Sequence, residues 1–86
     1  MNRDQLNMVP AKDTIHAAYA ALSGAQSFPP PQQVMGAAIL FNEMCELLQL
    51  DPSEMLDKCR RVRINALDHY SIEMRALQDY IRGELR

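Results

Sequence analysis

Three consecutive prolines, Pro29 to Pro31, constrain the fold of this chain more than any other feature of its sequence. Proline fixes φ and has no N–H group to donate, so a proline run cannot lie inside a helix. We expect Pro29 and Pro30 to be extended, whereas Pro31 can be the first residue of a helix, where no N–H is needed. The run therefore places a stiff connector at residues 23–30, between an N-terminal helix and the rest of the chain.

Apolar residues elsewhere recur at the spacing of amphipathic helices, and no segment alternates as a strand would. We therefore expect an all-α fold, a small bundle of three to four helices. Polar residues 1–12 are expected to form a flexible lead-in with at most one helical turn, and 13–86 a single helical domain. Asp13 is a candidate N-cap for the first helix, which Ser23 and Gly24 end. The expected helices span residues 14–22, 31–48, 52–67 and 69–85.

The sequence "DPSE" at Asp51–Glu54 is the clearest helix-start signal in the chain. Asp51 can cap the helix, Pro52 suits its first position, and Glu54 can reach back to the cap N–H group. The third helix is therefore predicted to begin at Pro52. Between Asn65 and Ser71 neither Gly nor Pro marks a break, so the last two helices are either separate or one long bent helix.

The segment 31–48 is apolar nearly all round, which is typical of a helix buried on several sides. We expect it at the centre of the fold, covered by the other helices or by a second subunit. A chain of 86 residues that is 48% apolar forms only a small core, and self-association is a common way to bury more. We therefore predict a homo-oligomer that packs through the central and C-terminal helices. The predicted interface residues are Met35, Ile39, Leu40, Leu47, Leu77 and Ile81.

Four basic residues, Lys58, Arg60, Arg61 and Arg63, lie in a capped helix that follows another helix and a tight turn. A DNA-binding helix-turn-helix has this layout. However, the turn position that usually holds Gly is Gln49, and acidic side chains occupy the start of the second helix, where base contacts would be made. At about 100° per residue the four charges point to different sides of the helix. A solvated surface is the simplest interpretation, and a patch for a protein, a small anion or DNA is the functional one.

No group of residues in the sequence has the spacing of a catalytic or metal site. Cys45 and Cys59 fall on the predicted inward faces of their helices, where cysteine is a small apolar residue. His16 and His69 do not complete a zinc pattern with them. We therefore expect no enzyme activity, no metal and no cofactor.

The net charge of −2 argues mildly against nucleic acid as a partner. The longest apolar run, Ala37–Phe41, is too short to cross a membrane, and the start of the chain has no secretion-signal pattern. Two cysteines without a CxxC pair are expected to be reduced thiols. Together these features predict a cytoplasmic protein that does not bind membranes.

Several of the six methionines, among them Met35, Met44, Met55 and Met74, lie in or beside the apolar faces. Methionine is a flexible core residue that is also frequent at adaptable binding surfaces. Core packing is the simplest interpretation. The alternative is a hydrophobic groove that accepts a partner helix.

The segments "QQVMGAAILFNEMCELLQLDPSEMLDKCRRV" and "ALQDYIRGELR", which together run from Gln32 to Arg86, resemble small uncharacterised helical proteins of tailed bacteriophages and prophages. The resemblance implies a small phage accessory protein in the host cytoplasm, of a class that binds host proteins or aids virion or DNA metabolism. It assigns no functional residue. The leading hypothesis is a non-enzymatic interaction protein that binds a host or phage protein. The alternatives are a small helix-turn-helix regulator and an oligomeric sponge for a small anionic ligand such as a nucleotide.

Overall fold

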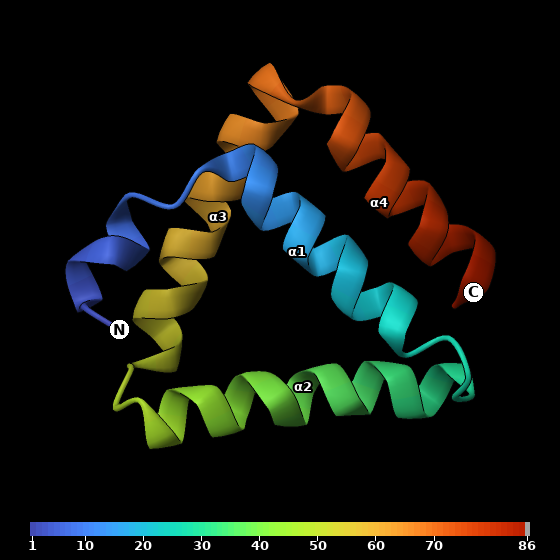
Figure 1. The fold of residues 1–86 in the computed structure, drawn as a ribbon, viewed down its shortest axis with the longest axis horizontal. Helices are drawn as coiled ribbons and strands as arrows, with labels where there is room; N and C mark the ends of the chain where they lie inside the picture. The colour runs from blue at the N-terminus through green and yellow to red at the C-terminus, as the bar shows by residue number, and fades with distance from the viewer. Residues whose placement is uncertain (86) are drawn as a thin grey trace.

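The computed structural model describes residues 1–85, and within them the fold is all-α, as the periodicity predicts. Figure 1 shows the path of the chain. The elements are the short 3-10 helix η1 (Arg3–Asn7) and the α-helices α1 (Ala11–Gly24), α2 (Pro30–Leu47), α3 (Pro52–His69) and α4 (Ser71–Glu84).

The N-terminal segment contains one short helix, η1, which agrees with the single helical turn expected there. The Asn2 side chain accepts a hydrogen bond from the Asp4 N–H group at 3.0 Å, and the Gln5 side chain accepts one from the Asn2 N–H group at 3.0 Å. This reciprocal capping box stabilises the first turn of η1. The Arg3 guanidinium then donates to the Gln49 carbonyl, which ties η1 to the connection between α2 and α3.

Helix α1 begins earlier than predicted, and Asp13 is not its cap. The N-cap is Pro10, whose carbonyl accepts hydrogen bonds from the Thr14 N–H group at 3.0 Å and from Thr14 Oγ1 at 2.8 Å. Asp13 lies in the first turn instead, where a negative charge interacts favourably with the helix dipole. The start of α3 agrees with the first two parts of its signal, since the Asp51 side chain accepts from the Ser53 N–H group at 2.9 Å and Pro52 begins the helix. The third part is wrong, because Glu54 forms an ion pair with Lys58 in place of a bond to the cap N–H group.

Tyr70 separates α3 from α4, so these are two helices rather than one bent helix. Its backbone (φ −134°, ψ 46°) leaves the helical region. Its N–H group still donates to the Ala66 carbonyl at 2.7 Å, and its carbonyl accepts from the Met74 N–H group at 3.0 Å. The break forms without Gly or Pro, and the half-buried Tyr70 side chain packs against the core at this point.

The core lies where α1, α3 and α4 meet. It consists of the buried side chains Ala11, Ile15, Ala66 and Met74, against which Val62, Tyr70 and Leu77 pack. At the far end of α1 and α4 the rings of Tyr19 and Tyr80 meet edge to face with centroids 4.8 Å apart. This three-helix unit contains most of the tertiary contacts of the protein.

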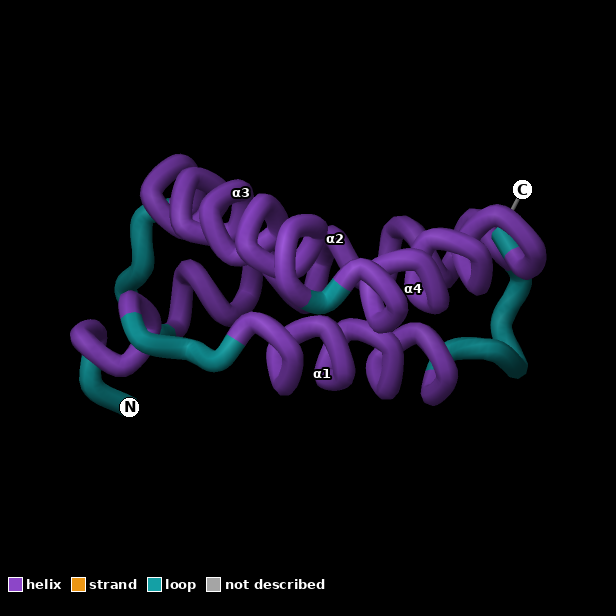
Figure 2. The backbone as a smooth tube through the Cα atoms, turned by 90° about the horizontal axis from the view of Figure 1, so that it is seen from above, coloured by secondary structure: helices purple, strands orange, loops and turns teal. Residues whose placement is uncertain are grey.

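Helix α2 is not central, so the prediction that it lies in the middle of the fold is wrong. The molecule is flat, 34 × 31 × 18 Å, and α2 forms one side of it while the other three helices pack together (Figures 1 and 2). Of the residues of α2, only Gln33 and Cys45 are buried. Periodicity identified an apolar helix, but it cannot indicate whether the same chain covers that helix.

A glutamine pair fixes the corner between α1 and α2. Gln33 Nε2 donates to the Phe28 carbonyl at 2.7 Å, and Gln33 Oε1 accepts from Gln26 Nε2 at 3.1 Å. Gln26 Nε2 also reaches the Leu22 carbonyl of α1 at 3.3 Å. Buried amides that satisfy each other in this way hold a corner at one geometry. The corner therefore directs α2 away from the three-helix unit.

Gln49 fixes the other corner, between α2 and α3, in a left-handed backbone conformation with φ 56°. The Leu50 N–H group donates to the Cys45 carbonyl at 2.8 Å and the Gln49 N–H group to the Glu46 carbonyl at 3.4 Å. These two bonds form a Schellman motif, in which glycine is the usual left-handed residue. Gly24, expected to take this role at the end of α1, has no positive φ.

Candidate functional site

A groove with a volume of about 580 Å³ lies between the three-helix unit and α2, and we call it the apolar groove. Nearly all of its lining is carbon. The lining residues include Leu6 and Val9 near η1, Ile15 and Ala18 of α1, Phe41 of α2, Met55, Cys59 and Val62 of α3, and Met74, Leu77 and Ile81 of α4. A groove of this size is large enough for side chains of a partner, and its walls offer mainly apolar contacts.

Polar side chains lie only at the rim of the apolar groove. Lys58 lines it and forms an ion pair with Glu54, with Nζ 3.3 Å from the carboxylate. The Lys58 side chain is mostly buried, so its methylene stem covers apolar surface while its amine remains paired. Thr14, Arg63 and Gln78 complete the polar part of the lining. An apolar floor with polar edges suits an amphipathic partner.

The two cysteines lie in different environments, and the prediction that both are buried is wrong for one of them. Cys45 is buried, with 4% of its surface exposed, beneath the end of α2. Cys59 is exposed and lines the apolar groove. Cys59 lies on the face of α3 that its spacing predicts to point inward, but α2 does not cover this face at Cys59. The groove therefore contains an accessible thiol.

The basic residues of α3 do not form one patch. Arg60 forms an exposed ion pair with Asp57 at 2.6 Å. Arg61 lines a second, smaller hollow of about 410 Å³ together with Lys58, Asn7 and Asn65, whereas Arg63 lines the apolar groove. The predicted binding residues are thus distributed over three places, as their angular spacing indicates.

The predicted oligomer-interface residues lie on two surfaces. Met35, Ile39, Leu40 and Leu47 are exposed on α2, and Leu47 is 80% exposed. Leu77 and Ile81 line the apolar groove instead.

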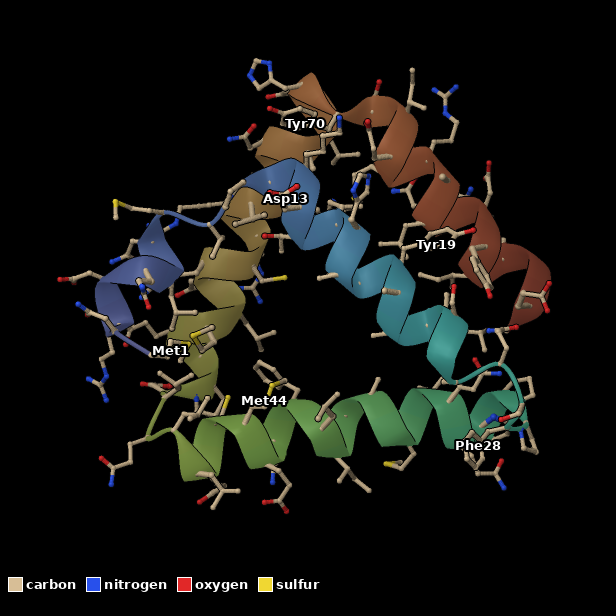
Figure 3. The ribbon with its side chains drawn as sticks, in the orientation of Figure 1. Met1, Asp13, Tyr19, Phe28, Met44 and Tyr70 are labelled. Carbon is tan, nitrogen blue, oxygen red and sulfur yellow. The ribbon has the colours of Figure 1, made fainter. Side chains whose placement is uncertain are left out.

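Two further apolar residues of α2, Val34 and Met44, and its C-cap residue Leu48 are also exposed. Figure 3 shows Met44 on the edge of α2 that faces the other helices. Their exposure could be expected from the sequence, because the helix is apolar on more sides than the other helices of a small chain can cover.

The fold and the site define an all-α protein of four helices with an apolar groove and one uncovered helix. No family model, curated protein or solved structure matches this chain. Within residues 1–85 no helix is long and apolar enough to span a membrane, and no group of three or more His, Cys, Asp or Glu residues has the geometry to hold a metal ion.

Proposed function

We propose that this protein is a non-enzymatic interaction protein of the phage accessory type, which acts as a homo-oligomer and binds a helical segment of a host or phage protein in the apolar groove. The observation that carries this proposal is the groove itself, about 580 Å³ in volume and lined mainly by apolar side chains of α1, α3 and α4. An amphipathic helix buries its apolar face in a groove of this kind and leaves its polar face at the rim.

The experiment is capture of partners from a host lysate by the tagged protein, compared between two matched variants of α4. Ile81 lines the groove and is 43% exposed, whereas Ile72 is 82% exposed and lies outside it. Ile81→Asp places a charge in the apolar groove and should abolish capture, while Ile72→Asp should leave it unchanged. Equal capture by both variants would contradict binding in the groove.

Cys59 provides a second measurement on the captured complex. A thiol reagent should label Cys59 in the free protein, and a bound helix should slow that labelling because the thiol lines the groove. The buried Cys45 serves as the internal control, since it should remain unlabelled in both states. A captured protein that leaves Cys59 fully reactive binds elsewhere.

The second hollow supports a different candidate function, the binding of a small anion such as a nucleotide. Two cationic side chains, Lys58 and Arg61, line it together with the amides of Asn7 and Asn65. Arginine and amide N–H groups are donors that suit phosphate oxygens. A thermal-shift screen against nucleotides tests this function. Stabilisation should disappear in Arg61→Ala and persist in Arg60→Ala, since Arg60 pairs with Asp57 and does not line the hollow.

The helix-turn-helix alternative has less support from the geometry. Both ion pairs of the first half of α3, Glu54 with Lys58 and Asp57 with Arg60, partly neutralise the basic run on which phosphate binding would depend. A duplex-DNA shift assay at low salt tests it, with Arg60→Ala plus Arg61→Ala as the variant that should lose any shift.

A further inference from the structure

Helix α2 contains an apolar stripe that its own chain does not cover. Ala37, Leu40, Met44 and Leu47 follow one another at spacings of three and four residues, so they form one continuous row along the helix. All four are exposed. The row has the a and d spacing by which one helix packs against another, and it contains no charged residue.

The two corners of α2 keep this stripe uncovered. The Gln26–Gln33 pair holds one end of the helix, and the Schellman motif at Gln49 holds the other. Both corners are satisfied by hydrogen bonds within the chain. For α2 to rotate and cover its stripe against the three-helix unit, these hydrogen bonds would have to break. The stripe therefore stays exposed and can bind another molecule.

The exposed surface area of the chain is larger than that of a compact monomer, and the difference indicates how much surface a partner would bury. The exposed area is 6514 Å², whereas a folded monomer of 9.8 kDa is expected to expose about 5,200 Å². The excess is roughly 1,300 Å², which lies within the roughly 1,000–2,500 Å² that each chain of an obligate homodimer buries. The radius of gyration agrees, at 13.4 Å against about 12 Å for a compact chain of this length.

A second copy of the chain supplies the matching surface. A two-fold interface uses the same patch on both partners, so that patch must be able to pack against itself. Two α2 stripes meet this condition, because each is an uncharged row of three large apolar side chains and the small Ala37, which allows a close approach. Helix α2 borders the apolar groove through Phe41, which is not one of the stripe residues.

We infer that α2 is a dimerisation helix: two copies of this chain pack their α2 stripes together around a two-fold axis. This inference rests on the proposed interaction function and names the partner of the α2 face. It leaves the groove floor on α3 and α4 for the proposed host or phage partner. The interface is centred on Ala37, Leu40, Met44 and Leu47.

Light scattering on the purified protein tests the dimer, over concentrations from about 1 to about 100 µM. The expected mass is that of two chains of 9.8 kDa. Leu40→Asp should raise the dimer dissociation constant at least about 100-fold, because the two-fold axis places the new charge in the interface twice. Ile72→Asp is the control: it also replaces an exposed apolar residue by a charged one, but on α4, and it should leave the mass unchanged.

Because Leu40 is exposed in the single chain, Leu40→Asp should retain its helical circular dichroism, and Leu47→Lys offers a second variant at a still more exposed position. A monomer at every concentration would overturn the dimer, as would a dimer that both variants leave intact. A monomeric protein that still captures a partner through Ile81 would overturn the dimer and the proposed homo-oligomer, and would leave the proposed partner binding in the groove standing. A dimer that captures nothing would overturn only the proposed partner binding.

Discussion

At the scale of single residues, Gln49 is the most unusual feature of the backbone. It is the only non-glycine residue with positive φ within residues 1–85, and it completes the Schellman motif that ends α2. A side chain in this region is disfavoured because its Cβ approaches the following carbonyl, at a cost of roughly 1–2 kcal/mol. The conformation persists because the Arg3 guanidinium and the Leu50 N–H group hydrogen-bond on either side of it.

Gln49→Gly should therefore stabilise the protein. Glycine adopts the left-handed conformation without the Cβ penalty, and we expect a gain of about 1 kcal/mol in the free energy of unfolding, or several degrees in Tm. Urea denaturation of the two proteins measures the difference. Gln49→Ala is the control, which keeps Cβ and should give no such gain. Equal stabilisation by both would mean that the Gln49 side chain, and not its backbone, was the source.

The residues whose structure was predicted correctly from the sequence are those that depend on neighbouring atoms alone. The Asp51–Pro52 signal predicted the first residue of α3, because a cap depends only on neighbouring atoms. Cys59 was misplaced, because its burial depends on α2, more than ten residues away along the chain. Tyr70 ended α3 through contact with the core, and no local signal indicates such a contact.

At the scale of elements, the glutamine pair determines where α2 points. Gln33 is the only buried polar residue described, and both of its amide atoms have partners. Gln33→Leu should lower the free energy of unfolding by about 1–3 kcal/mol, because it removes the hydrogen bonds of Gln33 to the Phe28 carbonyl and to the Gln26 amide.

The adjacent exposed Gln32 provides a matched control for this measurement, since Gln32→Leu adds the same apolar side chain without removing a buried hydrogen bond. Its effect should stay within about 0.5 kcal/mol. If both variants lose the same stability, the corner is not held by the glutamine pair. Such a result would also mean that the Gln26–Gln33 pair does not hold α2 apart from the other helices.

The helices themselves were predictable because each carries its own periodicity, but their arrangement was not. Three helices formed a unit around Ala11, Ile15, Ala66 and Met74, and the most apolar helix lay outside it. An apolar helix face predicts that the face will be covered. It does not indicate whether the same chain or another molecule covers it. Leu40 and Leu47 are exposed in the single chain, and their coverage by a second subunit stays a prediction.

At the scale of the whole molecule, α2 should be the least protected helix of a single chain. Segments with few tertiary contacts open at low free energy, and α2 has few contacts with the three-helix unit. Hydrogen exchange of the Leu40→Asp variant should therefore show fast exchange across Pro30–Leu47 and slower exchange in α1, α3 and α4. In the wild-type protein at high concentration, α2 should become protected as the dimer forms. Uniform protection of all four helices in the variant would contradict this order.

The way α2 is held at its two corners has a consequence for the lifetime of the protein in a cell. A newly made single chain displays an apolar helix that chaperones and proteases recognise, and degradation follows the population of such open forms. Pairing through α2 would conceal that helix. The survival of each copy would then depend on meeting another, so the amount of protein in the cell would rise steeply once synthesis passed the concentration at which copies pair.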